Sequence, residues 1–165
     1  MEAAPPLAIV DIDGVVADVR HRLHHIEGRR KSWQRFFDEA GDDGLHEEGR
    51  AIVERLREDH EVVYLTGRPR WLEGVTRAWL EEHGLGGHRL VMRPDDDRRP
   101  AAQLKVEALH RLADGRVVGI VVDDDRRVVD AMAAAGFPTF HADWERRALD
   151  EQRALTKAQE EEGRT

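Results

Sequence analysis

Two aspartates one residue apart follow a short apolar run near the start of the chain, in LAIVDIDGVVA. Side chains alternate along a β-strand, so Asp11 and Asp13 should project from one side while Ile12 points into the packing. Two carboxylates held on one face at a strand end repel each other, which is unfavourable in free energy unless a cation lies between them. The pattern favours a divalent-metal site in which Asp11 is also a nucleophile, and the alternative is a solvated acidic turn.

Three further polar elements follow in chain order. Thr66 comes directly after the run EVVYL, where its hydroxyl and the backbone N–H groups of the turn can hold a phosphoryl oxygen. Lys105 opens the helical pattern AAQLKVEAL in an arginine-rich chain whose other lysines are Lys31 and Lys157, which favours a compact point charge over a surface lysine. Asp123 and Asp124 end the run VVGIVV and again indicate a metal ligand.

The elements that must position these residues alternate between strands and helices. We expect strands at 7–10, 61–65, 89–92, 117–122 and 138–141. Apolar residues at helical spacing predict the four intervening helices, with core faces at Leu45, Ile52, Val53 and Leu56; Leu72, Val75 and Trp79; Leu104, Leu109 and Leu112; and Val128, Val129 and Met132. This alternation predicts a Rossmann-like, three-layer α/β/α domain with a central parallel sheet. The site should then lie at the carboxyl ends of the strands.

The segment between the first strand and the helix near Glu47 is irregular in pattern. We interpret residues 14–46 as a small flap over the site, without a large cap. Its aromatic residues, in SWQRFF, could stack a nucleobase, but their spacing favours a short helix that docks on the core. The basic run at residues 29–31 is either a phosphate contact or a charged loop. We expect one domain over 1–144 and a charged helix or tail over 145–165.

Composition narrows the class of protein. The 165 residues carry a formal charge of −8, which excludes a globally basic nucleic-acid surface, so any phosphate site must be local. The chain has no cysteine, which excludes disulfides and thiolate chemistry. No segment resembles a signal peptide or reaches membrane-span length. We therefore expect a cytoplasmic protein with no membrane partner, and the sequence leaves its oligomeric state open.

The order strand–DxD, strand–Thr, helix–Lys, strand–DD closely resembles the haloacid dehalogenase superfamily, up to about residue 144. The resemblance implies that Asp11 forms an aspartyl phosphate and that Asp13 is the general acid and then the general base. Thr66 and Lys105 would hold the phosphoryl group. The metal would be Mg²⁺, bound by Asp11, the backbone carbonyl of Asp13, and either or both acids of the pair at 123–124.

Within that superfamily the phosphatase domain of polynucleotide kinase is the most similar subgroup we identify. It is similar in the DxDG motif, in an arginine about ten residues on, and in the turn TGR. It is also similar in TRAWL, LVM, KVE and the DD strand end. The resemblance implies that Arg22, Gly67 and Arg68 contact the substrate. This chain departs from the subgroup at Ala101, where an acidic residue is usual.

These observations predict a Mg²⁺-dependent phosphomonoesterase that removes 3′-phosphate from nucleic-acid or nucleotide ends. By this resemblance Asp13 favours a phosphatase or phosphotransferase over the dehalogenases and ATPases of the superfamily, which lack that acid. A small flap leaves the site open to a bulky phosphoester, whereas a full cap encloses small molecules. The alternatives are a broad small-molecule phosphatase or nucleotidase, and a non-catalytic module that binds nucleic-acid ends.

Overall fold

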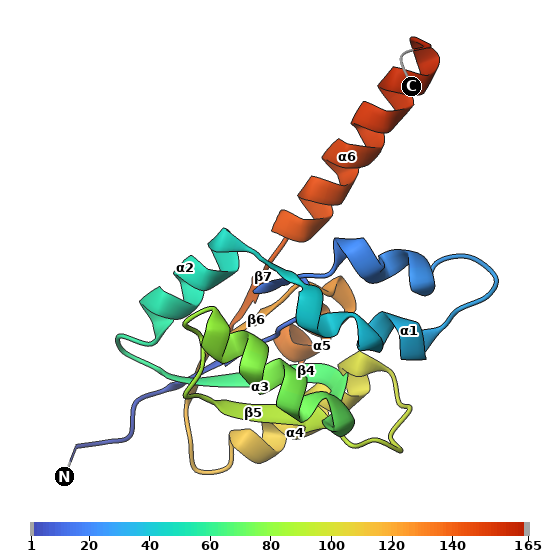
Figure 1. Cartoon of the computed structure of the whole chain (residues 1–165). Helices are drawn as coiled ribbons and strands as arrows, with labels where there is room; N and C mark the ends of the chain where they lie inside the picture. The colour runs from blue at the N-terminus through green and yellow to red at the C-terminus, as the bar shows by residue number, and fades with distance from the viewer. Residues whose placement is uncertain (1, 164–165) are drawn as a thin grey trace.

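The computed structural model describes residues 2–163 and has a five-stranded parallel sheet at its centre (Figure 1). In spatial order its strands are β5 (Arg89–Arg93), β4 (Glu61–Pro69), β1 (Leu7–Val10), β6 (Val118–Asp123) and β7 (Thr139–His141). The first strand in the chain is therefore the middle strand of the sheet. This order confirms the predicted Rossmann-like fold and places the residues that follow β1 at the centre of one sheet edge.

Helices cover both faces of the sheet, because alternate residues of the central strand face opposite ways. On one face Ala8 and Val10 belong to a buried cluster that includes residues of α2 (Glu47–Leu56) and α3 (Glu73–Glu82). On the other face Leu7 and Ile9 join a cluster with residues of α4 (Ala101–Leu112) and α5 (Arg126–Ala134). Burial of these apolar strands on both sides holds the strand ends, and the residues after them, in place.

The flap is more regular than its sequence pattern indicates. β2 (Ala17–Asp18) pairs antiparallel with β3 (Gly44–Leu45), so the two ends of the flap are joined by hydrogen bonds. Between them lie η1 (Arg20–His25), α1 (Trp33–Asp38) and η2 (Ala40–Asp42). Ser32 caps α1, because its hydroxyl accepts a hydrogen bond from the Arg35 N–H at 3.3 Å.

Two details of the predicted helices are wrong. Leu45 lies in β3, because the chain there completes the strand pair of the flap before the helix begins at Glu47. Val75 was expected on the core face of its helix but is exposed, since Leu72 belongs to the preceding turn η3 (Arg70–Leu72) and α3 packs through Thr76, Trp79 and Leu80 instead.

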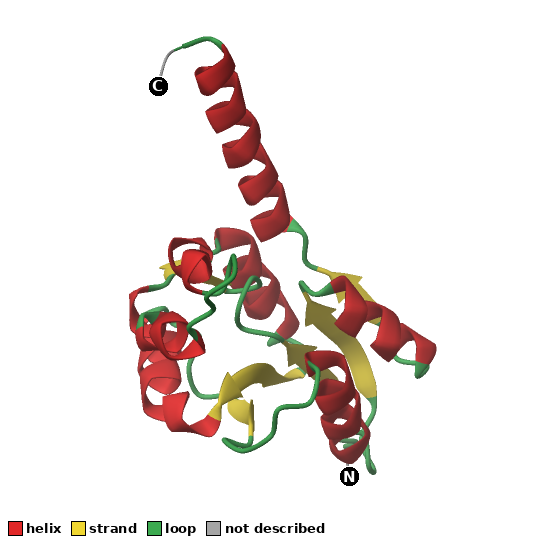
Figure 2. Ribbon diagram, turned by 90° about the vertical axis from the view of Figure 1, so that its right-hand side faces the viewer, coloured by secondary structure: helices red, strands yellow, loops and turns green. Residues whose placement is uncertain are grey.

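The last helix, α6 (Trp144–Glu161), extends away from the rest of the domain (Figures 1 and 2). Its first two residues, Trp144 and Glu145, are buried, and the Trp144 indole N–H donates a hydrogen bond to the Val15 carbonyl at 2.8 Å. Beyond Asp150 its residues are exposed as far as the structure describes them. No helix within the described residues is both long and apolar enough to span a membrane.

Candidate active site

A cleft of about 370 Å³ lies at the carboxyl ends of β1, β4 and β6. Because the three strands are parallel neighbours, the polar residues at their ends meet there. The cleft brings together the side chains that the sequence pattern picked out: Asp11, Asp13, Thr66, Gly67, Arg68, Lys105, Asp123 and Asp124. The predicted site residue that does not line it is Arg22.

Lys105 is the buried cation of the cleft. Its Nζ donates to Asp123 Oδ2 at 2.6 Å and lies 3.0 Å from Asp11 Oδ1. Burial alone would lower the pKa of Lys105, but the carboxylates of Asp11 and Asp123 hold it well above its usual value. The lysine is therefore charged, and it fixes the orientation of both acids.

Asp11, Asp123 and Asp124 form a group that we call the acidic trio, with carboxylate oxygens within 4.8 Å of one another. Burial and then the Asp123 carboxylate raise the pKa of Asp11 to about 7, and burial beside Asp11 raises that of Asp124. Gly14 makes room for the trio: its φ is +78°, and a Cβ there would lie 2.1 Å from Asp124 Oδ2. Hard oxygen donors crowded in this way fit a divalent cation such as Mg²⁺.

The Asp13 side chain points away from the trio toward two arginines. Its Oδ1 accepts hydrogen bonds from Arg68 Nε at 2.9 Å, Arg68 Nη2 at 2.6 Å and Arg22 Nη2 at 3.1 Å. Burial alone would raise the pKa of Asp13, but the guanidiniums of Arg68 and Arg22 hold it below its usual value. The arginines thus stabilise the carboxylate form of Asp13.

Arg22 lies beside the cleft rather than in its lining. The side chain is fully buried behind Asp13, with the Phe36 ring centre 4.1 Å from its Cζ. All three of its nitrogens donate hydrogen bonds, to Asp13, Asp43 and the Phe36 carbonyl. In this arrangement Arg22 does not line the cleft, and the substrate contact expected of it stays a prediction. Arg68 is also buried and is held by the same two acids, but it does line the cleft.

Asp43 joins the two arginines and was missed by the sequence analysis. Its carboxylate is fully buried and accepts hydrogen bonds from Arg22 Nε at 2.7 Å, Arg22 Nη2 at 2.8 Å and Arg68 Nη2 at 2.9 Å. The Trp79 indole N–H donates to the Asp43 carbonyl at 2.8 Å and fixes its backbone. The sequence shows only that an acidic residue, Asp43, directly precedes β3. The fold is needed to place its carboxylate between an arginine of η1 and an arginine of β4.

Charge counting supports a cation in the cleft. The trio, Asp13 and Asp43 contribute five carboxylates, while Lys105, Arg22 and Arg68 contribute three positive charges. Buried charges are stable only when they are compensated. When all five carboxyls are ionised the set lacks two positive charges, and burial together with this crowding raises the pKa of Asp11 and Asp124. One Mg²⁺ ion would supply the two missing charges.

Thr66, Gly67 and Arg93 form the side of the cleft nearest β5. Thr66 Oγ1 accepts a hydrogen bond from the Arg68 N–H at 3.1 Å, so its own hydroxyl proton can point to a ligand. Arg93 was not picked out from sequence. It donates to three carbonyls, among them Gly67 O at 3.0 Å and Arg99 O at 2.6 Å, and to no carboxylate. Its charge is therefore available to an anion in the cleft.

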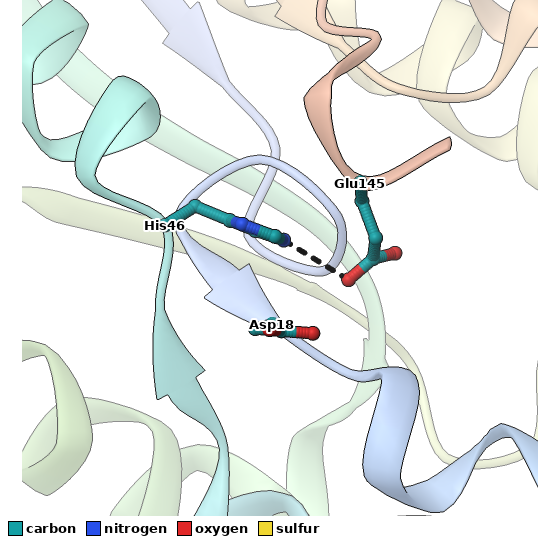
Figure 3. Close-up of side chains that lie close together, drawn as sticks. All are labelled: Asp18, His46 and Glu145. Carbon is teal, nitrogen blue, oxygen red and sulfur yellow. Dashed lines mark hydrogen bonds and ion pairs between the residues drawn. The ribbon is translucent and has the colours of Figure 1, made fainter. Parts of the chain in front are cut away.

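A second polar group lies at the base of α6, formed by Asp18, His46 and Glu145 (Figure 3). Glu145 Oε1 accepts a hydrogen bond from the Val19 N–H at 2.9 Å and lies 3.1 Å from His46 Nε2. Asp18 is engaged by the Arg20 guanidinium at 2.6 Å. These bonds tie the first turn of α6 to the flap and to the start of α2, and Glu145 also lines the cleft.

Residues 5–145 match the protein family described as the polynucleotide kinase PNKP phosphatase domain. The chain belongs to this family. The matched region contains every residue of the cleft described above, and it confirms the resemblance inferred from the motifs. The chain is therefore a PNKP-type phosphatase domain of the haloacid dehalogenase class. A comparison with curated proteins gave no match.

Solved structures share the fold at low sequence identity. A chain in the structure of the Pnkp1/Rnl/Hen1 RNA repair complex has a TM-score of 0.70 and 21% identity, over 86% of this chain and 43% of that one. A haloacid dehalogenase-like hydrolase from Streptococcus pneumoniae has a TM-score of 0.58 and 9% identity, over 83% and 84%. A haloacid dehalogenase family enzyme from Bacteroides thetaiotaomicron, solved with magnesium and phosphate, has 0.52 and 10%, over 84% and 94%. The PNKP-type chain thus spans less than half of the chain matched in the repair complex.

Proposed function

We propose that this PNKP-type domain is a Mg²⁺-dependent phosphomonoesterase that removes the 3′-phosphate from nucleic-acid or nucleotide ends. The observation that carries the proposal is the cleft itself. A carboxylate able to attack phosphorus, Asp11, contacts the buried cation Lys105 and belongs to an acidic trio suited to Mg²⁺, and a second carboxylate, Asp13, lines the same cleft. Membership of the phosphatase family supports the same reaction.

The reaction would proceed in two steps. Asp11 attacks phosphorus and forms an aspartyl phosphate, while Asp13 gives its proton to the leaving oxygen. Asp13, now a carboxylate, accepts a proton from water as the water oxygen attacks the aspartyl phosphate, which releases inorganic phosphate and restores Asp11. Bound Mg²⁺ would offset the negative charge of the phosphoryl oxygens. Lys105, Thr66 and the backbone at Gly67 would hold those oxygens in place.

The two arginines behind Asp13 suit this exchange of roles. They favour its carboxylate form, which the second step needs as a base. A phosphate dianion that enters the cleft brings negative charge next to Asp13 and raises its pKa, which favours the protonated form that the first step needs. We assign Arg22, Arg68 and Asp43 to positioning the Asp13 carboxylate. For Arg22 we propose this role in place of the direct contact with substrate that the sequence suggested.

Support for a nucleic-acid end as substrate comes from the opening of the cleft. The flap covers one side with short elements and does not enclose a ligand, so a phosphate on a long chain can enter. Arg93 lines the cleft and makes no ion pair with a carboxylate among the described residues, so its positive charge can serve the phosphate or its neighbour. A structural relative belongs to a complex named for RNA repair, which agrees with this substrate class.

Turnover assays with matched substrates test the proposal. A 3′-phosphorylated oligonucleotide should be hydrolysed with a higher kcat/KM than its 5′-phosphorylated isomer or a sugar phosphate, and Asp11→Asn should abolish turnover of all three. A higher kcat/KM for sugar phosphates or free 5′-nucleotides would contradict a nucleic-acid end as the substrate and would indicate a small-molecule phosphatase. Wild-type activity in Asp11→Asn would refute the aspartyl-phosphate route.

A further inference from the structure

An exposed aromatic surface borders the cleft. The side chains of Trp33 and Trp71 are 53% and 48% exposed, which is unusual for such large apolar residues. The ring of Phe37 lies between them, with its centre 5.9 Å from each of the two tryptophans. We call these three residues the aromatic rim.

The aromatic rim joins the flap to the strand end that carries the phosphate-binding turn. Trp33 and Phe37 come from α1 and line the cleft together with Asp11. Trp71 follows that turn by three residues, and its backbone N–H is fixed by Asp95 Oδ1 at 2.9 Å. The rim is thus continuous with the catalytic cleft and is held from both sides.

Packing of the flap accounts for only one of the aromatic side chains of α1. Phe36 is buried against the Arg22 guanidinium and performs the docking that the sequence pattern favoured. Trp33 lies on the same short helix, and its ring meets Phe36 edge-on while half of its surface faces solvent. Docking therefore accounts for Phe36, whereas Trp33 stays half-exposed and Phe37 is only half-buried between the two tryptophans.

Exposed cations without an ion pair are concentrated in the chain next to the rim, although Arg57, Arg89 and Arg98 elsewhere in the described chain also make none. Several arginines elsewhere on the surface pair with a carboxylate on their own helix. Five exposed cations next to the rim in the chain make no ion pair with any residue that the structure describes: Arg29, Arg30, Lys31, Arg35 and Arg70. In a chain of formal charge −8, a local set of free cations is a place where an anion can bind.

We propose that the aromatic rim stacks the terminal nucleobase of a single-stranded end while the flanking cations hold its phosphate backbone. Stacking on aromatic side chains combined with nearby positive charge is the general chemistry by which proteins bind single strands without reading their sequence. The inference rests on the proposed function, since it places the base of the same substrate whose 3′-phosphate enters the cleft. It makes the rim a determinant of KM rather than of the chemical step.

Kinetics with paired substrates test the rim. Trp33→Ala and Trp71→Ala are compared with Phe140→Ala, which removes a similarly exposed ring (47%) outside the cleft. The substrates are a 3′-phosphorylated oligonucleotide and deoxyribose 3-phosphate, which has no base. We expect each rim variant to raise KM for the oligonucleotide about tenfold, with kcat within about twofold and a much smaller change in KM for the base-free substrate. Trp33→Phe should recover most of the loss.

The outcomes separate the rim from the proposed function. If the wild type hydrolyses the oligonucleotide well and the two tryptophan variants have the same KM as Phe140→Ala, base stacking on the rim is contradicted and the proposed substrate class stands. Equal losses on both substrates would also overturn the rim, because stacking acts only on a base. If the wild type prefers deoxyribose 3-phosphate, the substrate class fails and the rim with it. A direct check is quenching of tryptophan fluorescence by the oligonucleotide in Asp11→Asn, which Trp33→Ala should reduce.

Discussion

Asp13 has the most demanding position in the cleft, because a proton must leave it in one step and return in the next. Asp13→Asn keeps the shape of the side chain and its contact with the arginines but cannot transfer a proton. We expect kcat to fall by about 10² to 10⁴ for alkyl phosphates. The loss should be smaller for p-nitrophenyl phosphate, whose leaving group needs little protonation. Equal losses for all leaving groups, measured over a graded substrate series, would contradict the acid role.

Asp43 is the residue whose importance only the fold reveals. Asp43→Asn removes the charge that both buried guanidiniums share, and breaking a buried charged network of this kind costs about 3–5 kcal/mol. Urea unfolding should show a loss of that order together with a reduced kcat, since Asp13 loses its fixed partners. The neighbouring exposed Asp42→Asn is the matched control and should leave the stability nearly unchanged. A similar loss in both variants would remove the special role of Asp43.

At the scale of elements, the contact between α2 and the loop after β1 sets how closely the flap sits on the sheet. Gly49 lies in the first turns of α2, and a Cβ there would be 1.9 Å from the Val15 carbonyl oxygen. Gly49→Ala should therefore destabilise the protein by about 1–3 kcal/mol, although alanine favours helices. Gly74→Ala on α3 meets no atom within 4 Å and should be neutral or stabilising. Thermal unfolding of the pair measures the difference, and equal shifts would contradict the close contact.

Elements with a strong apolar pattern were predictable from sequence, and so was the part of the site attached to them. β1, β4 and β6 are apolar, largely buried runs, so the positions of Asp11, Thr66 and Asp123 after those runs followed from the fold class alone. The flap was harder, because its short elements are held by charged contacts between distant segments rather than by a periodic apolar face.

The arginines of the cleft show the same limit of sequence analysis. Sequence spacing identified Arg22 as part of the site, but it could not distinguish a contact with substrate from a contact with Asp13. That distinction depends on burial and on a third residue, Asp43, twenty-one positions away from the arginine in the chain. Arg93 was missed because its significance lies in bonding only carbonyl groups, which no sequence pattern records.

At the scale of the whole molecule, the excess of negative charge predicts that activity depends on a divalent metal ion. With its five carboxyls ionised the cleft network lacks two positive charges, and the chain as a whole is acidic, so removal of divalent ions should leave these carboxylates uncompensated. Chelation with EDTA should abolish phosphatase activity, and Mg²⁺ should restore it more fully than Ca²⁺, because Mg²⁺ keeps a tighter octahedral geometry. Phosphate release measured across a metal titration provides the readout. Full activity in EDTA would remove the metal from the mechanism.

The C-terminal helix α6 sets the distance between the cleft and the far end of the helix. Its first turn is fixed to the domain through Trp144 and Glu145, so the direction of the helix is set beside the cleft. Its 18 residues rise about 1.5 Å each, which gives a length of about 27 Å. A helix behaves as a semi-rigid spacer, unlike a flexible tether whose ends explore many separations. Whatever is attached near Glu161 is therefore kept at a nearly constant distance from the phosphate-binding cleft.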